Sequence, residues 1–171
     1  MPAILDVSKA LKYPGQEYAF EVHPEIEEMD VLGDPVAFEE IAASGIFFGT
    51  GERVSVRGSV TAQVKSRCSR CLEPVCAPIT AEIDGLFARQ ADPDDPDLYY
   101  FEGFKLDLTD AVRDALLLEM PYRFLCSADC KGLCPNCGKN LNLGLCTCQE
   151  DATAASPFSA LKAIVQNNEE V

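Results

Sequence analysis

Hydrophobic and polar residues alternate most regularly between Val54 and Lys65. This period of two is typical of a half-buried β-strand that has one polar face. A second alternating segment, residues 74–89, predicts another strand of similar length. Because only a short stretch containing Cys68 and Cys71 separates the two segments, we expect a β-hairpin with a CxxC motif at its tip.

Other segments predict shorter elements. Residues 18–22 alternate well enough for a strand, whereas residues 34–43, with Pro35 near their start, suit a short helix. An acidic loop broken by prolines is expected at residues 92–97. After it, residues 99–101 are expected to form a short strand or an anchor on the core.

Two helices are predicted in the second half of the chain. Asp107 is a suitable N-cap, Asp110 lies in the first turn, and Pro121 ends the helix because proline restricts the residue before it. After a small-residue linker at 152–156, apolar residues at helical spacing predict a final amphipathic helix that starts near Pro157.

The composition favours a soluble cytoplasmic protein. Hydrophobic residues make up 47% of the 171-residue chain, which is enough for a real core. No apolar run approaches the roughly 18 residues that a membrane helix needs, and the N-terminus lacks the features of a secretory signal. In a reducing compartment, nine cysteines indicate metal or redox chemistry rather than disulfides.

Eight of the nine cysteines fall into four close pairs. The pairs are Cys68 and Cys71, Cys126 and Cys130, Cys134 and Cys137, and Cys146 and Cys148. Structural zinc takes four ligands, so eight thiolates predict two closed, all-cysteine sites. The last two pairs would form a compact zinc ribbon, and the first two would pin the hairpin tip to the end of the helix. Cys76 is left over, and we expect it to be buried and apolar.

Two other interpretations of the cysteines stay open. They could be buried free thiols, although close pairs are not expected of core cysteines. They could also be redox-active, but a redox CxxC belongs at the start of a helix, whereas Cys68 follows an alternating strand and Pro74 lies close behind. With one histidine and no nucleotide-binding glycine motif, the sequence offers no catalytic set, and we expect no enzyme.

The order of elements is strands, helix, cysteine-rich segment and helix. This order predicts an α+β fold with an antiparallel β-sheet, packed helices and a C-terminal Cys-rich zinc knuckle. We expect residues 1–125 to form the α+β domain that carries the CxxC hairpin. Residues 126–150 would form the zinc-binding knuckle, and residues 151–171 a helix that packs back on the main domain.

Cations gather near the cysteines although the net charge of the chain is −14. Five cations and no acid lie between residues 53 and 72. The candidate nucleic-acid-binding residues are Arg57, Lys65, Arg67 and Arg70. Alternatively, Arg67, Arg70, Lys131 and Lys139 could be partners of the thiolate sulfurs around the metals.

Several of these motifs together resemble the YceD family. The resemblance rests on the CxxC at residues 67–72, the string CKGLCPNCGKNLN at 130–142, the closing CTC at 146–148 and residues 156–161. It implies a non-enzymatic factor in large ribosomal subunit biogenesis, linked to the accumulation of large-subunit ribosomal RNA. We expect its partner to be ribosomal RNA or a large-subunit ribosomal protein, with no membrane and no small-molecule substrate.

Two alternatives to this function stay open. One is a zinc–thiol redox switch that releases its metal on oxidation. The other is a protein-interaction adaptor with purely structural zinc, which the acidic bulk and the terminal helix around Phe158 favour. The leading hypothesis places the binding of RNA or of a ribosomal protein on the metal-bearing face.

Overall fold

The computed structural model describes residues 3–31, 33–90 and 97–148. It divides the chain into two units, of which the first ends at Cys130 and the second begins at Lys131. The first unit is built on a β-sheet, whereas the described part of the second unit consists of turns and one isolated β-bridge.

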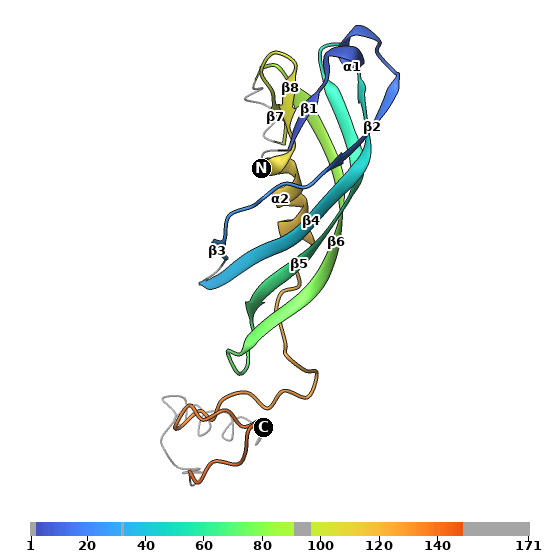
Figure 1. Ribbon diagram of the computed structural model, residues 1–171. Helices are drawn as coiled ribbons and strands as arrows, with labels where there is room; N and C mark the ends of the chain where they lie inside the picture. The colour runs from blue at the N-terminus through green and yellow to red at the C-terminus, as the bar shows by residue number, and fades with distance from the viewer. Residues whose placement is uncertain (1–2, 32, 91–96, 149–171) are drawn as a thin grey trace, which may run out of the picture. The chain divides into compact units, whose positions relative to one another are not determined.

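Three long antiparallel strands form the frame of the first unit (Figure 1). β4 (Asp34–Gly49), β5 (Val54–Arg67) and β6 (Pro74–Ala88) follow one another as a meander and curve together. β2 (Glu17–Val22) pairs with β4, and the short β7 (Tyr99–Tyr100) pairs in parallel with β6. The sheet is therefore antiparallel, as predicted, except at this one edge.

Smaller elements complete the first unit. β3 (Met29–Val31) pairs with the start of β4, and β1 (Ile4–Asp6) pairs with β8 (Lys105–Asp107) in a separate two-stranded sheet. The helices of the described residues are α1 (Ser8–Lys12) and α2 (Thr109–Glu119). The unit is mostly strand, so the expectation of packed helices is met only weakly, chiefly by α2.

The core lies on the face of the sheet that α2 covers (Figure 1). Alternation along β5 turns Val54, Val56, Val60 and Val64 to this face, where they are almost completely buried. From α2, Ala111, Val112 and Leu116 are buried. Burying one large aliphatic side chain contributes roughly 1.5–3 kcal/mol, so the packing of these β5 and α2 side chains is a main source of the stability of the unit.

The ends of α2 lie close to the predicted positions. The carboxylate of Asp107 accepts hydrogen bonds from the backbone N–H and the hydroxyl of Thr109, at 2.9 and 2.6 Å. Since Leu108 occupies the N-cap position, Asp107 acts one residue earlier than predicted. At the other end Met120 is extended, as expected of the residue before Pro121.

The helix predicted for residues 34–43 is wrong, because this segment forms the first part of β4. The register between β4 and β5 shifts between Glu39 and Ala42, and Glu40 has a positive φ of 52°. Such a β-bulge adds one residue to the strand. It separates the buried Phe38 from the buried Ile41 by three positions instead of two, and this spacing imitates the period of a helix.

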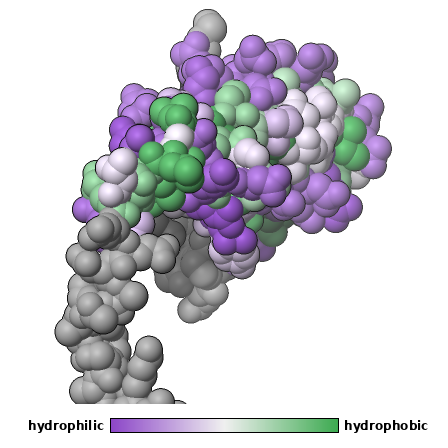
Figure 2. Space-filling view, turned by 90° about the horizontal axis from the view of Figure 1, so that it is seen from below, coloured by the Kyte–Doolittle hydropathy of each residue, from purple (hydrophilic) through white to green (hydrophobic). Residues whose placement is uncertain are grey.

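Some large hydrophobic side chains lie on the surface. Figure 2 shows small hydrophobic groups among hydrophilic residues on the face seen from below. The exposed large hydrophobic residues are Ile4, Tyr13, Leu72, Tyr100, Phe104, Leu118, Tyr122, Leu143 and Leu145. Within the ranges that the structure describes, no helix is long and apolar enough to cross a membrane. The predicted linker at 152–156, the helix from Pro157 and most of the acidic loop at 92–97 lie outside these ranges.

Gly45 and Gly58 face each other where β4 pairs with β5, and the two backbones lie too close there to leave room for a side chain. A Cβ atom on Gly58 would lie 2.3 Å from the carbonyl oxygen of Ser44. We therefore predict that Gly58→Ala lowers the free energy of unfolding by about 1–3 kcal/mol, measured by urea denaturation. The exposed Ser59→Ala is the matched control, with an expected change within about 0.5 kcal/mol. Equal urea midpoints for the two variants would contradict the close approach of the β4 and β5 backbones.

Candidate metal centres

The tip of the β5–β6 hairpin holds the first cysteine pair. Pairing of the two strands runs up to Arg67 and Pro74, and the turn between them is closed by two backbone hydrogen bonds. The N–H of Cys68 donates to the carbonyl of Glu73 at 2.8 Å, and the N–H of Leu72 donates to the carbonyl of Cys68 at 2.9 Å. The predicted CxxC at a hairpin tip is therefore present in the structure.

The segment that follows α2 brings the second pair to this tip. The N–H of Ser69 donates to the carbonyl of the buried Phe124 at 2.8 Å. The guanidinium of Arg70 donates to the carbonyls of Cys130 at 2.8 Å and Ala128 at 3.4 Å. These bonds fix the loop that contains Cys126 beside the hairpin.

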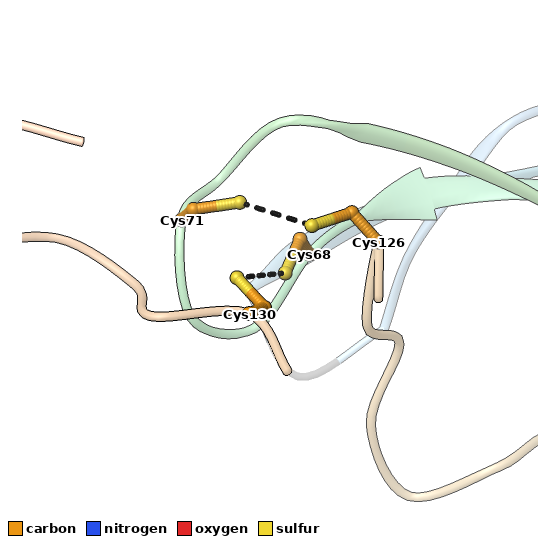
Figure 3. A group of neighbouring side chains, drawn as sticks. All are labelled: Cys68, Cys71, Cys126 and Cys130. Atoms are coloured by element: carbon orange, nitrogen blue, oxygen red, sulfur yellow. Dashed lines mark hydrogen bonds between the residues drawn. The ribbon is translucent and has the colours of Figure 1, made fainter. Parts of the chain in front are cut away.

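Four sulfur atoms meet in this first group (Figure 3). The sulfur of Cys68 lies 3.8 Å from that of Cys130, and the sulfur of Cys71 lies 3.5 Å from that of Cys126. All four lie within 4.8 Å of one another. A tetrahedral zinc with bonds of about 2.3 Å has sulfurs roughly 3.8 Å apart, whereas a disulfide needs about 2.0 Å. The group therefore has the dimensions of a metal site with four cysteine ligands.

The second group lies within the second unit. Its four sulfurs, from Cys134, Cys137, Cys146 and Cys148, also lie within 4.8 Å of one another. The sulfurs of Cys134 and Cys146 are 3.4 Å apart. The N–H of Cys134 donates to the carbonyl of Lys139 at 2.8 Å, which closes the knuckle. The grouping in space follows the pairing that the sequence spacing predicts, and none of the nine cysteines, all of which the structure describes, forms a disulfide.

The two knuckles share one backbone design. Gly138 follows the second cysteine of its knuckle, has φ of 72°, and donates its N–H to the carbonyl of Cys134 at 2.9 Å. Leu72 holds the same place in the first knuckle, with φ of 62° and the corresponding bond to Cys68, also at 2.9 Å. This left-handed conformation costs a residue with a side chain roughly 1–2 kcal/mol. Leu72 and Gly138 each follow the second cysteine of a CxxC motif. This shared position is the sequence signal that could have revealed the left-handed conformation of Leu72.

Backbone amides favour the thiolate form of one cysteine in each group. Burial opposes ionisation of Cys68, but the N–H groups of Cys126, Arg70 and Cys71 outweigh burial and lower the pKa of Cys68 to about 6. In the second group, two N–H groups of its own turn lower the pKa of Cys134 to about 6.

Neighbouring sulfurs have the opposite effect on other members. Hydrogen bonding with Cys71 and Cys130 raises the pKa of Cys126 to about 12. Hydrogen bonding with Cys137 is the main cause that raises the pKa of Cys148 to about 12. A bound divalent cation deprotonates the thiols that coordinate it. Four sulfurs gathered this closely therefore fit a metal ion better than they fit four neutral thiols, and both groups could hold one.

Cys76, which was predicted to be buried, is exposed. It lies on β6, where the alternate residues Ile79, Ala81 and Ile83 turn inward. Cys76 has the opposite phase along the strand, so its side chain points away from the core and its thiol lies 3.6 Å from the amide oxygen of Gln63. The period of the strand overrides the general tendency of cysteine to be buried.

The cations that lie close together in the sequence are spread apart in the structure. Arg57 and Arg67 are ten residues apart on β5, which corresponds to roughly 33 Å along a strand. Arg57 lies 3.7 Å from the carboxylate of Asp84, and Lys65 pairs with Glu39 at 2.5 Å. Arg70 lies at the hairpin tip and donates to two backbone carbonyls of the segment that follows α2. The four residues therefore do not form one compact patch, and only Arg67 and Arg70 lie beside the first cysteine group.

The fold and the site define a class, which is a small β-sheet protein with two groups of four cysteines able to hold metal ions. The profile of the family described as large ribosomal RNA subunit accumulation protein YceD matches residues 56–165. The chain belongs to the YceD family.

Its relatives come from bacteria and plants. An uncharacterized protein of Mycobacterium tuberculosis is 30% identical over 146 residues, which cover 80% of this chain and 70% of the relative. The uncharacterized protein YlbN of Bacillus subtilis is 26% identical over 131 residues, covering 74% and 76%. The Arabidopsis thaliana protein named large ribosomal RNA subunit accumulation protein YCED homolog 1, chloroplastic, is 33% identical over 67 residues, covering 38% and 21%. No solved structure matches the chain.

The first prediction for these centres concerns metal content. The purified protein should carry about two metal ions per chain, measured by elemental analysis. Cys71→Ser should lose one ion, because it removes one sulfur of the first group, whereas the exposed Cys76→Ser should lose none. Loss of metal from Cys76→Ser, or none from Cys71→Ser, would contradict the assignment.

The two groups should differ in how quickly they release their metal. Three of the four cysteines in the first group are buried, whereas only Cys134 is buried in the second. A chelator should therefore remove metal from the second group first. Single-site variants separate the two rates: Cys137→Ser, which keeps the first group, should release its metal more slowly than Cys71→Ser, which keeps the second. The reverse order would show that exposure does not control release.

Proposed function

We propose that the protein is a non-enzymatic zinc-binding factor in large ribosomal subunit biogenesis. In this function it supports the accumulation of large-subunit ribosomal RNA by binding that RNA or a large-subunit ribosomal protein. The observation that carries the proposal is the presence of two four-cysteine groups in a chain of the YceD family. The family description and the plant relative's name support the ribosomal role.

The ligand set supports zinc with a structural role. Sites of four cysteines are typical of structural zinc, whereas catalytic zinc keeps an open position and three protein ligands. The residues that would hold the ions are those of the two groups described above. Each filled site would carry a charge of about −2, and the positive charge of Arg70 would offset part of it at the first group. We expect the protein to act in the cytoplasm.

Redox switching is a second candidate for the second group alone. Cys137 is exposed and Cys146 and Cys148 are half-buried, so an oxidant can reach these sulfurs. Oxidised cysteines lose their metal. If zinc has this signalling role, mild peroxide should release one equivalent quickly and a thiol reductant should restore binding; a purely structural site should resist the same treatment.

The proposal predicts a defect in ribosomal RNA. Disrupting the gene should lower the amount of large-subunit ribosomal RNA relative to small-subunit ribosomal RNA, measured on total RNA. The unaltered gene and Cys76→Ser should restore the ratio, whereas Cys71→Ser should not, because the hairpin tip would lose its metal. An unchanged ratio after disruption would refute the proposed function.

The candidate cations allow a more specific version of this test. A glutamate substitution at the exposed Arg67, beside the first group, should weaken association with ribosomal RNA. Arg70 is left unchanged in this test, because its guanidinium holds the carbonyls of Ala128 and Cys130. The same change at Arg57 and Lys65 should have a smaller effect, because Asp84 and Glu39 already accompany these cations. Binding can be measured by filter retention at several salt concentrations, since phosphate contacts weaken as salt rises. If neither Arg67 nor the pair Arg57 and Lys65 matters, the phosphate contacts lie elsewhere.

A further inference from the structure

We propose that the metal-bearing end of the first unit binds single-stranded RNA, with Tyr122 as a platform for base stacking and Leu72 as a second, apolar contact. This inference rests on the proposed ribosomal function and names the kind of RNA and the residues that would receive it. Neither residue belongs to the metal sites or to the cations singled out by the sequence.

Tyr122 is the most exposed large hydrophobic residue that the structure describes, with an accessibility of 109% of the reference value. It follows Pro121, whose ring restricts the backbone, and precedes the exposed Arg123. Two residues later the carbonyl of Phe124 accepts the hydrogen bond from Ser69 at the hairpin tip. The chain between them is short, so the Cα atom of Tyr122 lies within roughly 7 Å of that of the anchored Phe124.

Leu72 lies in the turn that this bond anchors. Its side chain is 55% exposed, so little burial offsets the strain of its positive φ. Gly138 takes the same conformation in the second knuckle without a side chain. The metal-binding turn itself therefore does not need a leucine, and a contact outside the folded chain gives the side chain a role.

The charges near these two side chains suit RNA. Arg67 and Arg123 are exposed at this end of the unit, whereas the guanidinium of Arg70 already binds two carbonyls. The whole chain carries a net charge of −14, so a long duplex laid across it would meet repulsion. A short single strand needs few phosphate contacts, and its unstacked bases can lie on aromatic and apolar side chains. A basic protein partner would instead favour the acidic surfaces.

Binding of short oligonucleotides to the metal-loaded, full-length protein tests the inference. The probe is a labelled single-stranded RNA of mixed sequence, about ten nucleotides long, a length in the range that single-strand sites cover, and fluorescence anisotropy gives the affinity. Tyr122→Ala should weaken binding by about 5- to 150-fold, the range expected for loss of one stacked base. Tyr122→Phe, which keeps the ring, should bind like the unaltered protein. The same sequence as a duplex should bind more weakly.

Leu72→Gly separates recognition from folding. It should weaken RNA binding while it raises the melting temperature and keeps about two metal ions per chain, because glycine relieves the backbone strain. A variant that binds RNA normally would overturn the role of Leu72, whatever its stability. Normal binding by Tyr122→Ala, or equal binding of duplex and single strand, would overturn the stacking role.

The cellular ratio of ribosomal RNAs distinguishes this inference from the proposed function. If gene disruption lowers that ratio but the purified protein does not bind single-stranded RNA, the function stands and the inference fails. If Tyr122→Ala also fails to restore the ratio in that case, this end of the unit contacts a protein instead. If disruption leaves the ratio unchanged, the proposed function fails even where the RNA binds.

Discussion

The meeting of four sulfurs from two distant chain segments is the constraint on which the cysteine-bearing end of the first unit depends. Cys68 and Cys130 are 62 residues apart in sequence, yet their sulfurs lie 3.8 Å apart. The paired β5 and β6 deliver one half of the group, and α2 with the segment after it delivers the other. The hydrogen bonds from Ser69 and Arg70 to the segment after α2 hold the two halves together. A metal ion bound there would in turn hold the segment after α2 against the hairpin.

The sequence predicts the hairpin and the close cysteine pairs well because both depend on local spacing. Strict alternation defines β5 and β6, and Cys68 continues the inward phase of β5. The prediction failed at β4, where the bulge at Glu39–Ala42 disrupts alternation and only pairing with β5 identifies a strand. The prediction failed again at Cys76, because the alternation of β6, and not the apolar character of cysteine, determines that this side chain is exposed.

The cations show a different limit of sequence analysis. Arg57 and Arg70 are close in sequence, but an extended strand separates them, and neutralising acids come from other strands. Asp84 on β6 and Glu39 on β4 reach Arg57 and Lys65 only because of the sheet register. A cluster of charge along a chain therefore becomes a surface patch only where the chain turns, as it does at the hairpin tip.

The two four-cysteine groups share a turn geometry but differ in what supports them. In the first unit the knuckle extends a sheet with a large core, so much of its order comes from β5 and β6. Of residues 131–148, only Gly132 and Cys134 are buried, and the described part of this unit therefore lacks a hydrophobic core of its own. Small units without a core commonly depend on a metal for folding. The second group is thus the principal source of order that the described residues offer to their unit, whereas at the first group a metal would join parts that are already folded.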